Sequence, residues 1–125
     1  MKRVFVVDDS NINLAKADEA LSDHYDVITV ASASTMFELI DHIIPDIILL
    51  DIMMPEMDGF EALELLKSNT KYKDIPVIFL TGKNDADTET RGFEAGVVDF
   101  IEKPFSKPVL IDRIEAVLKS DMVNS

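Results

Sequence analysis

The chain of 125 residues has no cysteine, no tryptophan, four glycines and five prolines. The absence of cysteine excludes a disulfide framework and thiol chemistry, and it is compatible with the cytoplasm, where we expect the protein to reside. The small number of glycines, together with a hydrophobic content of 47%, argues against a disordered chain. A single domain is therefore expected, because a chain of this length can bury one hydrophobic core.

Basic residues are also scarce, with 12 Lys and Arg against 24 Asp and Glu and a formal net charge of −12. This charge argues against direct binding of nucleic acid by the domain, since phosphate contacts need a basic surface. The most apolar stretch, residues 43–55, is interrupted by Asp46 and Asp51, so no membrane-spanning segment is predicted. The run VFVV at residues 4–7 is too short for the hydrophobic region of a secretory signal.

Short apolar runs alternate with segments of helical periodicity. The runs are rich in β-branched residues, which is typical of strands that are covered on both faces of a parallel sheet. They are VFVV (4–7), IIPDIILL (around 43–50), PVIFL (76–80) and VVDFI (97–101). The run DVITV (26–30) instead alternates polar and apolar residues, which suits an edge strand.

The segments between these runs place apolar residues every three or four positions, as on one face of a helix. These residues are Leu14, Ala17 and Leu21; Met36, Leu39, Ile40 and Ile43; Phe60, Leu63 and Leu66; and Leu110, Ile114, Val117 and Leu118. Segment 85–95 is also predicted to be helical, but with little apolar surface. It is therefore expected to be loosely packed or to need a partner.

Helix boundaries agree with this division. Residues that favour the first or last turn of a helix are Ser10 or Asn11, Ser32 or Ser34, Asp58, Asn84 or Asp85, Gly96 and Pro108. Five repeats of a strand followed by a helix predict an α/β fold, a doubly wound, flavodoxin-like three-layer sandwich with a parallel five-stranded sheet. Right-handed crossovers and a polar second strand favour the order 2-1-3-4-5. The domain is expected to span residues 1–120, with 121–125 as a tail or the start of a linker.

Polar residues follow four of the predicted strands. Asp8 and Asp9 follow the first strand, Asp51 the third, Thr81 the fourth and Lys103 the fifth. In an open parallel sheet, ligands bind beyond the carboxyl ends of the strands, near the point where the strand order reverses. We therefore expect these five side chains to converge at one edge of the sheet.

The chemistry of such a cluster follows from its groups. Three crowded carboxylates raise one another's pKa unless a cation compensates them, and oxygen ligands without His or Cys point to Mg²⁺. The hydroxyl of Thr81 and the ammonium of Lys103 would bind phosphoryl oxygens. A carboxylate in this setting can be a nucleophile that accepts a phosphoryl group. Asp51 is best placed for this role, which leaves Asp8 and Asp9 for the metal.

Taken singly, these residues have ordinary interpretations. Asp8 and Asp9 alone would indicate a solvated turn, Asp51 a loop acid, and Lys103 a surface turn. Their placement at one edge of the sheet is what favours a functional site. His24 and His42, by contrast, are expected to be exposed side chains without a ligand role.

The motifs at this edge together resemble the receiver domain of bacterial response regulators, such as the chemotaxis response regulator. They are the acidic pair at 8–9, DIMMPEMDG at 51–59, LTG at 80–82 and FIEKPF at 100–105. The resemblance covers roughly residues 3–120, and the motifs follow the order and spacing of the family. It implies a switch in a two-component phosphorelay, which catalyses only its own phosphorylation and dephosphorylation.

The resemblance also implies a role for each residue of the site. Asp51 would be the phosphoacceptor, and Asp9, Asp51 and the backbone carbonyl of Met53 would be direct Mg²⁺ ligands. Asp8 would hold the ion chiefly through water. Thr81 would bind a phosphoryl oxygen.

Further roles implied by the resemblance concern the fifth strand and the loops beside it. Lys103 would pair with the phosphoryl group or with Asp51, and the Lys103–Pro104 peptide would be cis. On phosphorylation Phe100 would turn into the space that Thr81 leaves, although Phe100 has no hydroxyl to bond there. Met53 and Lys83 would flank the route of the hydrolytic water, and the apolar Met53 predicts slow self-dephosphorylation.

The partners implied are a sensor histidine kinase or a phosphotransfer protein, and an effector domain or protein that reads the face made by the fourth helix, fifth strand and fifth helix. A phosphorylation-dependent homodimer stays open.

Three alternative functions also stay open. A flavin or nucleotide binder of similar fold would need a phosphate-binding loop where DDSN (8–11) places acid. A Mg²⁺-dependent aspartyl-phosphate hydrolase would need a second acid at Met53. The third alternative is a receiver-like interaction module that is not phosphorylated.

Overall fold

The computed structural model describes residues 1–82 and 85–124, the last four by their backbone alone. Five parallel strands form one sheet in the order β2-β1-β3-β4-β5. The strands are β1 (Arg3–Val7), β2 (Asp26–Val30), β3 (Ile47–Asp51), β4 (Val77–Thr81) and β5 (Asp99–Glu102). The helices are α1 (Asn11–Leu21), α2 (Ala33–Ile40), α3 (Gly59–Lys67), α4 (Ala86–Ala95) and α5 (Lys107–Asn124). The predicted fold class and strand order are confirmed.

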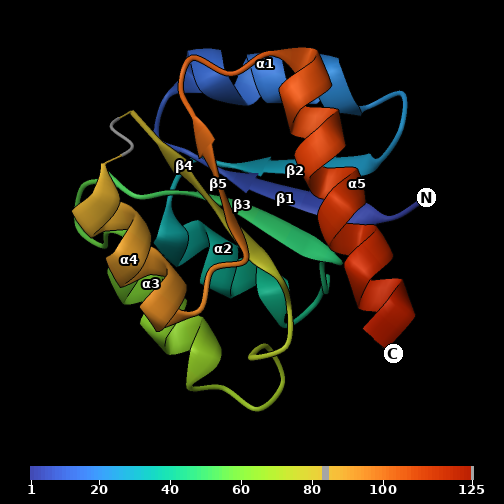
Figure 1. Cartoon of the computed structure of the whole chain (residues 1–125). Helices are drawn as coiled ribbons and strands as arrows, with labels where there is room; N and C mark the ends of the chain where they lie inside the picture. Colours follow the sequence, from blue (N-terminus) through green and yellow to red (C-terminus); the bar gives the residue numbers. More distant parts are fainter. Residues whose placement is uncertain (83–84, 125) are drawn as a thin grey trace.

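Helices cover both faces of the sheet (Figure 1). On one face, side chains of α1 and α5 pack on β1, β3, β4 and β5. On the other face, α2 and α3 cover the sheet and α4 lies beside α3. β1, β3 and β4 are buried almost throughout, whereas β2 at the edge is largely half-buried. The strands with continuous apolar runs are therefore covered by helices on both faces of the sheet, as the pattern predicted.

Two strands are shorter than their apolar runs. β3 begins at Ile47, not at residue 43, because the amide of Ile43 donates to Leu39 and closes the turn after α2. Pro45, between this turn and the strand, has no N–H to donate to a neighbouring strand. β5 begins at Asp99, because the amide of Val97 donates to Gly92 and completes the end of α4.

At the helix starts, one residue of each predicted pair is the cap, and Asp58 is the cap of α3 as predicted. Ser10, Ser32, Asp58 and Asp85 accept from a backbone amide of the first turn, and Asp58 forms a capping box with Glu61. These contacts satisfy amides that have no partner inside the helix. Asn84, the alternative to Asp85, lies outside the described residues. Gly96 ends α4 in the left-handed conformation, with φ of 117°, which glycine adopts without a steric penalty.

The last two helices differ from one another in their packing. Gly92 is the one buried residue of α4, all of which the structure describes, so the small apolar surface predicted for this helix is confirmed. α5 has Leu110 and Ile114 in the core and continues to Asn124, past residue 120. No Pro or Gly follows Pro108 to stop the helix, so the segment expected as a tail is helical up to Asn124. None of the helices in the described ranges combines the length and the apolar character that crossing a lipid bilayer requires.

Candidate functional site

The polar residues predicted to converge do so at the carboxyl edge of the sheet. Asp8 directly follows β1, Asp51 and Thr81 are the last residues of β3 and β4, and Lys103 directly follows β5. β1, β3, β4 and β5 are consecutive neighbours in the sheet, and their parallel registers bring the strand ends together. Strands distant in sequence thus supply one site because each ends at the same level.

The three acids form a compact oxygen cluster. One carboxylate oxygen each from Asp8, Asp9 and Asp51 lies within 4.8 Å of the others. Asp8 and Asp51 are buried, with 0% and 2% of their surface exposed, whereas Asp9 is exposed. The cluster is therefore open to solvent on the side of Asp9 and enclosed on the side of the other two.

A lysine compensates the two buried acids. The Lys103 ammonium lies 2.9 Å from Oδ1 of Asp51 and 3.5 Å from Oδ2 of Asp8. The backbone amide of Lys103 donates to the carbonyl of Thr81 at 2.7 Å, which fixes the loop after β5 to the end of β4. The Lys103–Pro104 peptide is cis, as the resemblance implied.

Burial and charge oppose each other in this pair. Burial raises the pKa of Asp51 to about 6, and the hydrogen bond from Lys103 limits that rise, while the charge of Asp8 adds to it. Burial acts to lower the pKa of Lys103, but the hydrogen bond and charge of Asp51, with Asp8, outweigh it, so this pKa is raised. Lys103 therefore stays an ammonium, and the pKa of Asp51 is raised toward neutral pH.

Two backbone amides and one side-chain amide hold Asp8 and Asp51 in position. The amide of Ser10 and the side-chain amide of Asn13 donate to Asp8 at 2.9 and 3.2 Å, so the first turn of α1 orients this carboxylate. Asn13 was not among the residues predicted from the sequence. The signal that could have found it is its place in the first turn of the helix that follows Asp8. The amide of Met53 donates to Oδ1 of Asp51 at 3.3 Å.

Gly59, at the start of α3, lies against the strand end that carries Asp51. A Cβ atom at residue 59 would lie 2.7 Å from the backbone oxygen of Asp51 and 2.8 Å from Cα of Ile52. Both contacts are with backbone, so neither can be relieved by a side-chain rotation. The glycine of the DIMMPEMDG motif thus allows α3 to begin directly beside the acceptor position.

Gly59→Ala is expected to lower the free energy of unfolding by about 1–3 kcal/mol, because the added methyl group overpacks a rigid contact. Denaturant unfolding measures this change. Gly82→Ala is the matched control, since a Cβ at residue 82 meets no atom within 4 Å. Equal losses in the two variants would contradict the close approach at residue 59.

The remaining predicted residues lie near the cluster in different environments. Thr81 is buried at the end of β4. Phe100 is already buried in the unmodified chain, 5% exposed, and its ring packs edge-on against Phe79 and Phe93, with centroid distances of 5.8 and 5.2 Å. The side chain of Met53 is exposed, and its carbonyl as a metal ligand stays a prediction. Lys83 lies outside the described residues.

A groove of about 360 Å³ adjoins the site on the side of α4. Its lining includes Met53, Thr81 and Gly82, and also Phe60 and Arg91. The Arg91 guanidinium stacks over the Phe60 ring, 3.9 Å from its centroid, and so joins α4 to α3. This contact could not be predicted from the sequence, because nothing in the spacing of residues 60 and 91 indicates it.

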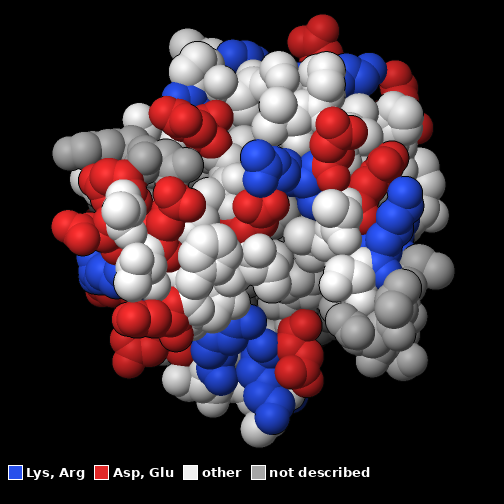
Figure 2. Space-filling view, in the orientation of Figure 1, with Lys and Arg blue, Asp and Glu red and all other residues white. Residues whose placement is uncertain are grey.

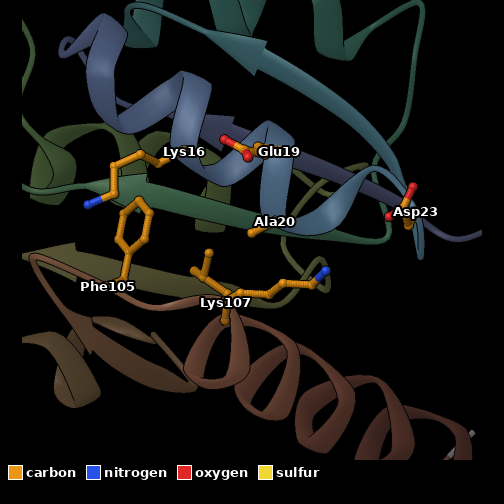
Figure 3. A pocket seen from close by; sticks show the side chains of 7 residues that line it. Lys16, Glu19, Ala20, Asp23, Phe105 and Lys107 are labelled. Carbon is orange, nitrogen blue, oxygen red and sulfur yellow. The ribbon is translucent and has the colours of Figure 1, made fainter.

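A second groove, of about 410 Å³, lies between α1 and α5 (Figure 3). Lys16 of α1 extends over the ring of Phe105, with its Nζ 5.7 Å from the centroid. Lys107 lines the same groove, with Glu19 of α1 on the other side. No lining residue belongs to the acidic cluster, so this groove is separate from the site.

Charge is distributed unevenly over the surface. Figure 2 shows acidic side chains gathered over α4, at the left of the view. Asp87 and Glu94 of this helix are exposed, and Glu89 is half-buried. His24 and His42 are exposed, as predicted.

The fold and the site together define a doubly wound α/β domain with a lysine-compensated acidic cluster at the switch point of its sheet. The family model of the response regulator receiver domain matches residues 4–115. The chain therefore belongs to the receiver domains of two-component response regulators, which are phosphoacceptor switches.

Relatives and solved structures agree with this assignment. A probable cyclic di-GMP phosphodiesterase of Vibrio cholerae is 39% identical over 117 residues, which are 94% of this chain and 26% of that protein. The chain thus spans about a quarter of the length of this relative. The structure of the chemotaxis protein CheY4 of Vibrio cholerae has a TM-score of 0.89 at 28% identity, covering 94% of this chain and 98% of that one. The BeF3-activated DrrB receiver domain has a TM-score of 0.85 at 30% identity, covering 95% and 98%.

Proposed function

We propose that Asp51 accepts a phosphoryl group from the phosphohistidine of a sensor histidine kinase or phosphotransfer protein, in a reaction that depends on Mg²⁺. The observation that carries this proposal is the buried Asp51 carboxylate, held 2.9 Å from the Lys103 ammonium within a cluster of three acids. The contact of Asp51 with Lys103 is shorter than that of Asp8, and Asp51 also ends the central strand β3.

The donor set fits a divalent cation of the Mg²⁺ type. Among the described residues, three carboxylates with converging oxygens and one compensating ammonium leave net negative charge, and oxygen is the ligand that Mg²⁺ prefers. Asp9, Asp51 and the carbonyl of Met53 would bind the ion directly, and Asp8 would do so chiefly through water. When bound, the ion neutralises charge on the phosphoryl oxygens.

The side chains of the site then have separate tasks in the transfer. An oxygen of Asp51 attacks phosphorus, so that the O–P bond forms as the P–N bond to the histidine of the donor breaks. The electron pair of the broken bond stays on the imidazole nitrogen, which takes up a proton. Lys103 moves from the carboxylate to a phosphoryl oxygen, and the hydroxyl of Thr81 donates to another.

The phosphorylated state is proposed to change the face made by α4, β5 and α5, which an effector domain or protein reads. The new charge-assisted bonds at Thr81 and Lys103 favour one of two arrangements that are close in energy. Thr81 moves inward, and the inward position of the Phe100 ring is favoured. The kinase, the effector, a phosphorylation-dependent homodimer and a cytoplasmic location belong to this proposal. The domain catalyses only its own phosphorylation and dephosphorylation.

Incubation with acetyl phosphate and Mg²⁺ tests the proposal. The intact mass is expected to increase by one phosphoryl group, and excess chelator is expected to prevent the increase. A protein that gains no mass under these conditions would support the interaction module that is not phosphorylated. Repeated turnover of a phosphate monoester, which lacks the activated bond of acetyl phosphate, would support the hydrolase instead, and flavin absorbance of the purified protein would support the flavin binder.

A further inference from the structure

One residue of α4 makes an unusually close approach to the fifth strand. A Cβ atom at Gly92 would lie 2.4 Å from Cζ of Phe100 and 3.2 and 3.3 Å from its two Cε atoms. The tip of the Phe100 ring therefore rests where any other residue type at this position would place its side chain. Alanine in place of Gly92 would require the ring or the helix to move.

This contact is central to how α4 is held. Gly92 is the one buried residue in the helix, whose residues are all described, and Phe93 beside it is 49% exposed. The Phe100 ring fills the space under Gly92 and also contacts Phe79 of β4. Another attachment of α4 is Arg91 on Phe60, at the surface of α3. Much of the buried surface of α4 thus packs against the Phe100 ring of β5.

The same ring lies close to the phosphorylation site. Phe79 pairs with Phe100 in the parallel ladder, so their side chains lie on the same face of the sheet. Thr81 is two residues beyond Phe79, on that face, which is a distance of about 6–7 Å along the strand. Thr81 is therefore close enough for its movement to affect the packing of Phe79 and Phe100.

We propose that Gly92 is a positioning residue of the switch. Because it has no Cβ, α4 accepts the Phe100 ring in its inward position before any phosphorylation, and the ring and the helix then move as one unit. The link to Asp51 rests on the proposed function, in which the phosphorylated state favours the inward ring. The Phe100 ring is already in its inward position in the unmodified chain. Gly92 therefore raises the fraction of molecules that have the arrangement stabilised by phosphorylation.

Gly92→Ala tests this proposal, with beryllofluoride and Mg²⁺ as the probe of the phosphorylated state. The methyl group displaces the ring, and the apparent affinity for beryllofluoride is expected to fall at least about fivefold, which is the low end of typical coupling between two sites. Thr90→Ala is the matched control. It also places alanine in α4, at an exposed position, and is expected to leave the affinity within about twofold of the wild type.

A double-variant comparison separates positioning from general damage. Phe100→Leu removes the ring atoms that the methyl group added by Gly92→Ala would meet, so Gly92→Ala in that background is expected to change the affinity little. Equal effects of Gly92→Ala with and without the Phe100→Leu substitution would overturn the proposal. If Gly92→Ala alone does not fold, recovery of folding in the double variant supports the ring contact, and failure to recover counts against it.

Nuclear magnetic resonance of the protein without Mg²⁺ or beryllofluoride tests the contact itself. A nuclear Overhauser effect between the Phe100 ring and the Gly92 α-protons is expected, and the Phe100 ring signals should shift in Gly92→Ala but not in Thr90→Ala. Absence of this effect would overturn the positioning role. Failure of the wild type to bind beryllofluoride would overturn the proposed function, while this measurement would still decide whether Gly92 holds the ring.

Discussion

Asp51→Asn is expected to gain no phosphoryl group from acetyl phosphate and to unfold less readily than the wild type at neutral pH. The first effect follows because the amide is a poor nucleophile in place of the carboxylate. The second follows because burial makes the charged carboxylate costly at this position, with the pKa of Asp51 raised to about 6. Intact mass and denaturant unfolding measure the two effects.

The sign of the stability effect depends on pH. The native carboxyl group has a pKa of about 6 against the ordinary value of 3.8, so between these values the folded state binds more protons than the unfolded state. The contribution of Asp51 to the free energy of unfolding of the wild type therefore falls as pH rises through this window. Asparagine does not titrate, so Asp51→Asn should be more stable by about 1–3 kcal/mol above pH ~6 and should lose this advantage below about pH 4.

Asp41→Asn is a suitable control for both effects. Asp41 is an exposed acid at the end of α2, outside the acidic cluster. The control variant should gain one phosphoryl group and match the stability of the wild type. A stability advantage of Asp51→Asn that does not vary with pH would contradict the account of the buried carboxylate.

Lys103→Gln is expected to slow phosphoryl transfer by about a hundredfold while Mg²⁺ binds no more weakly than before. The loss of rate follows because removal of a single well-placed donor to developing charge has an effect of this size. The binding of Mg²⁺ should not weaken, because the substitution removes a positive charge 2.9 Å from Asp51 and 3.5 Å from Asp8. The rate of mass increase with acetyl phosphate and calorimetric titration with Mg²⁺ give the two quantities.

The opposite behaviour of rate and metal binding distinguishes a role in transfer from a role in folding. Lys107→Gln, at an exposed lysine in the first turn of α5, controls for the loss of one positive charge and should leave both quantities close to wild type. A Lys103→Gln variant that transfers at the wild-type rate would contradict the role of the ammonium. Parallel loss of transfer and Mg²⁺ binding would indicate a collapsed site instead.

The order of the strands could be predicted because a strand buried on both faces is apolar throughout, whereas an edge strand alternates polar and apolar residues. β1, β3 and β4 are apolar almost throughout, and β2, half-buried at the edge, alternates. The boundaries of β3 and β5 could not be predicted in the same way. Ile43 and Val97 are apolar like the strands that follow, and only the hydrogen bonds that end α2 and α4 exclude them from the sheet.

The candidate site was predictable for a related reason. In a parallel sheet, each polar residue that directly follows an apolar strand reaches the same edge, so Asp8, Asp51 and Lys103 could be grouped without their distances. The sequence contains no signal for the contacts that α4 makes with β5 and with α3. Gly92 against Phe100, and Arg91 over Phe60, depend on the rotation of α4, which has too few apolar residues to predict its orientation.

The position of the covalent phosphoryl group tests the central claim most directly. The protein, phosphorylated with acetyl phosphate and Mg²⁺, can be reduced with borohydride, which converts an aspartyl phosphate to homoserine and marks its position in a peptide mass spectrum. The account predicts the mark at residue 51 and nowhere else among the three acids of the cluster. A mark at Asp8 or Asp9, or a phosphorylated protein without a mark at residue 51, would contradict it.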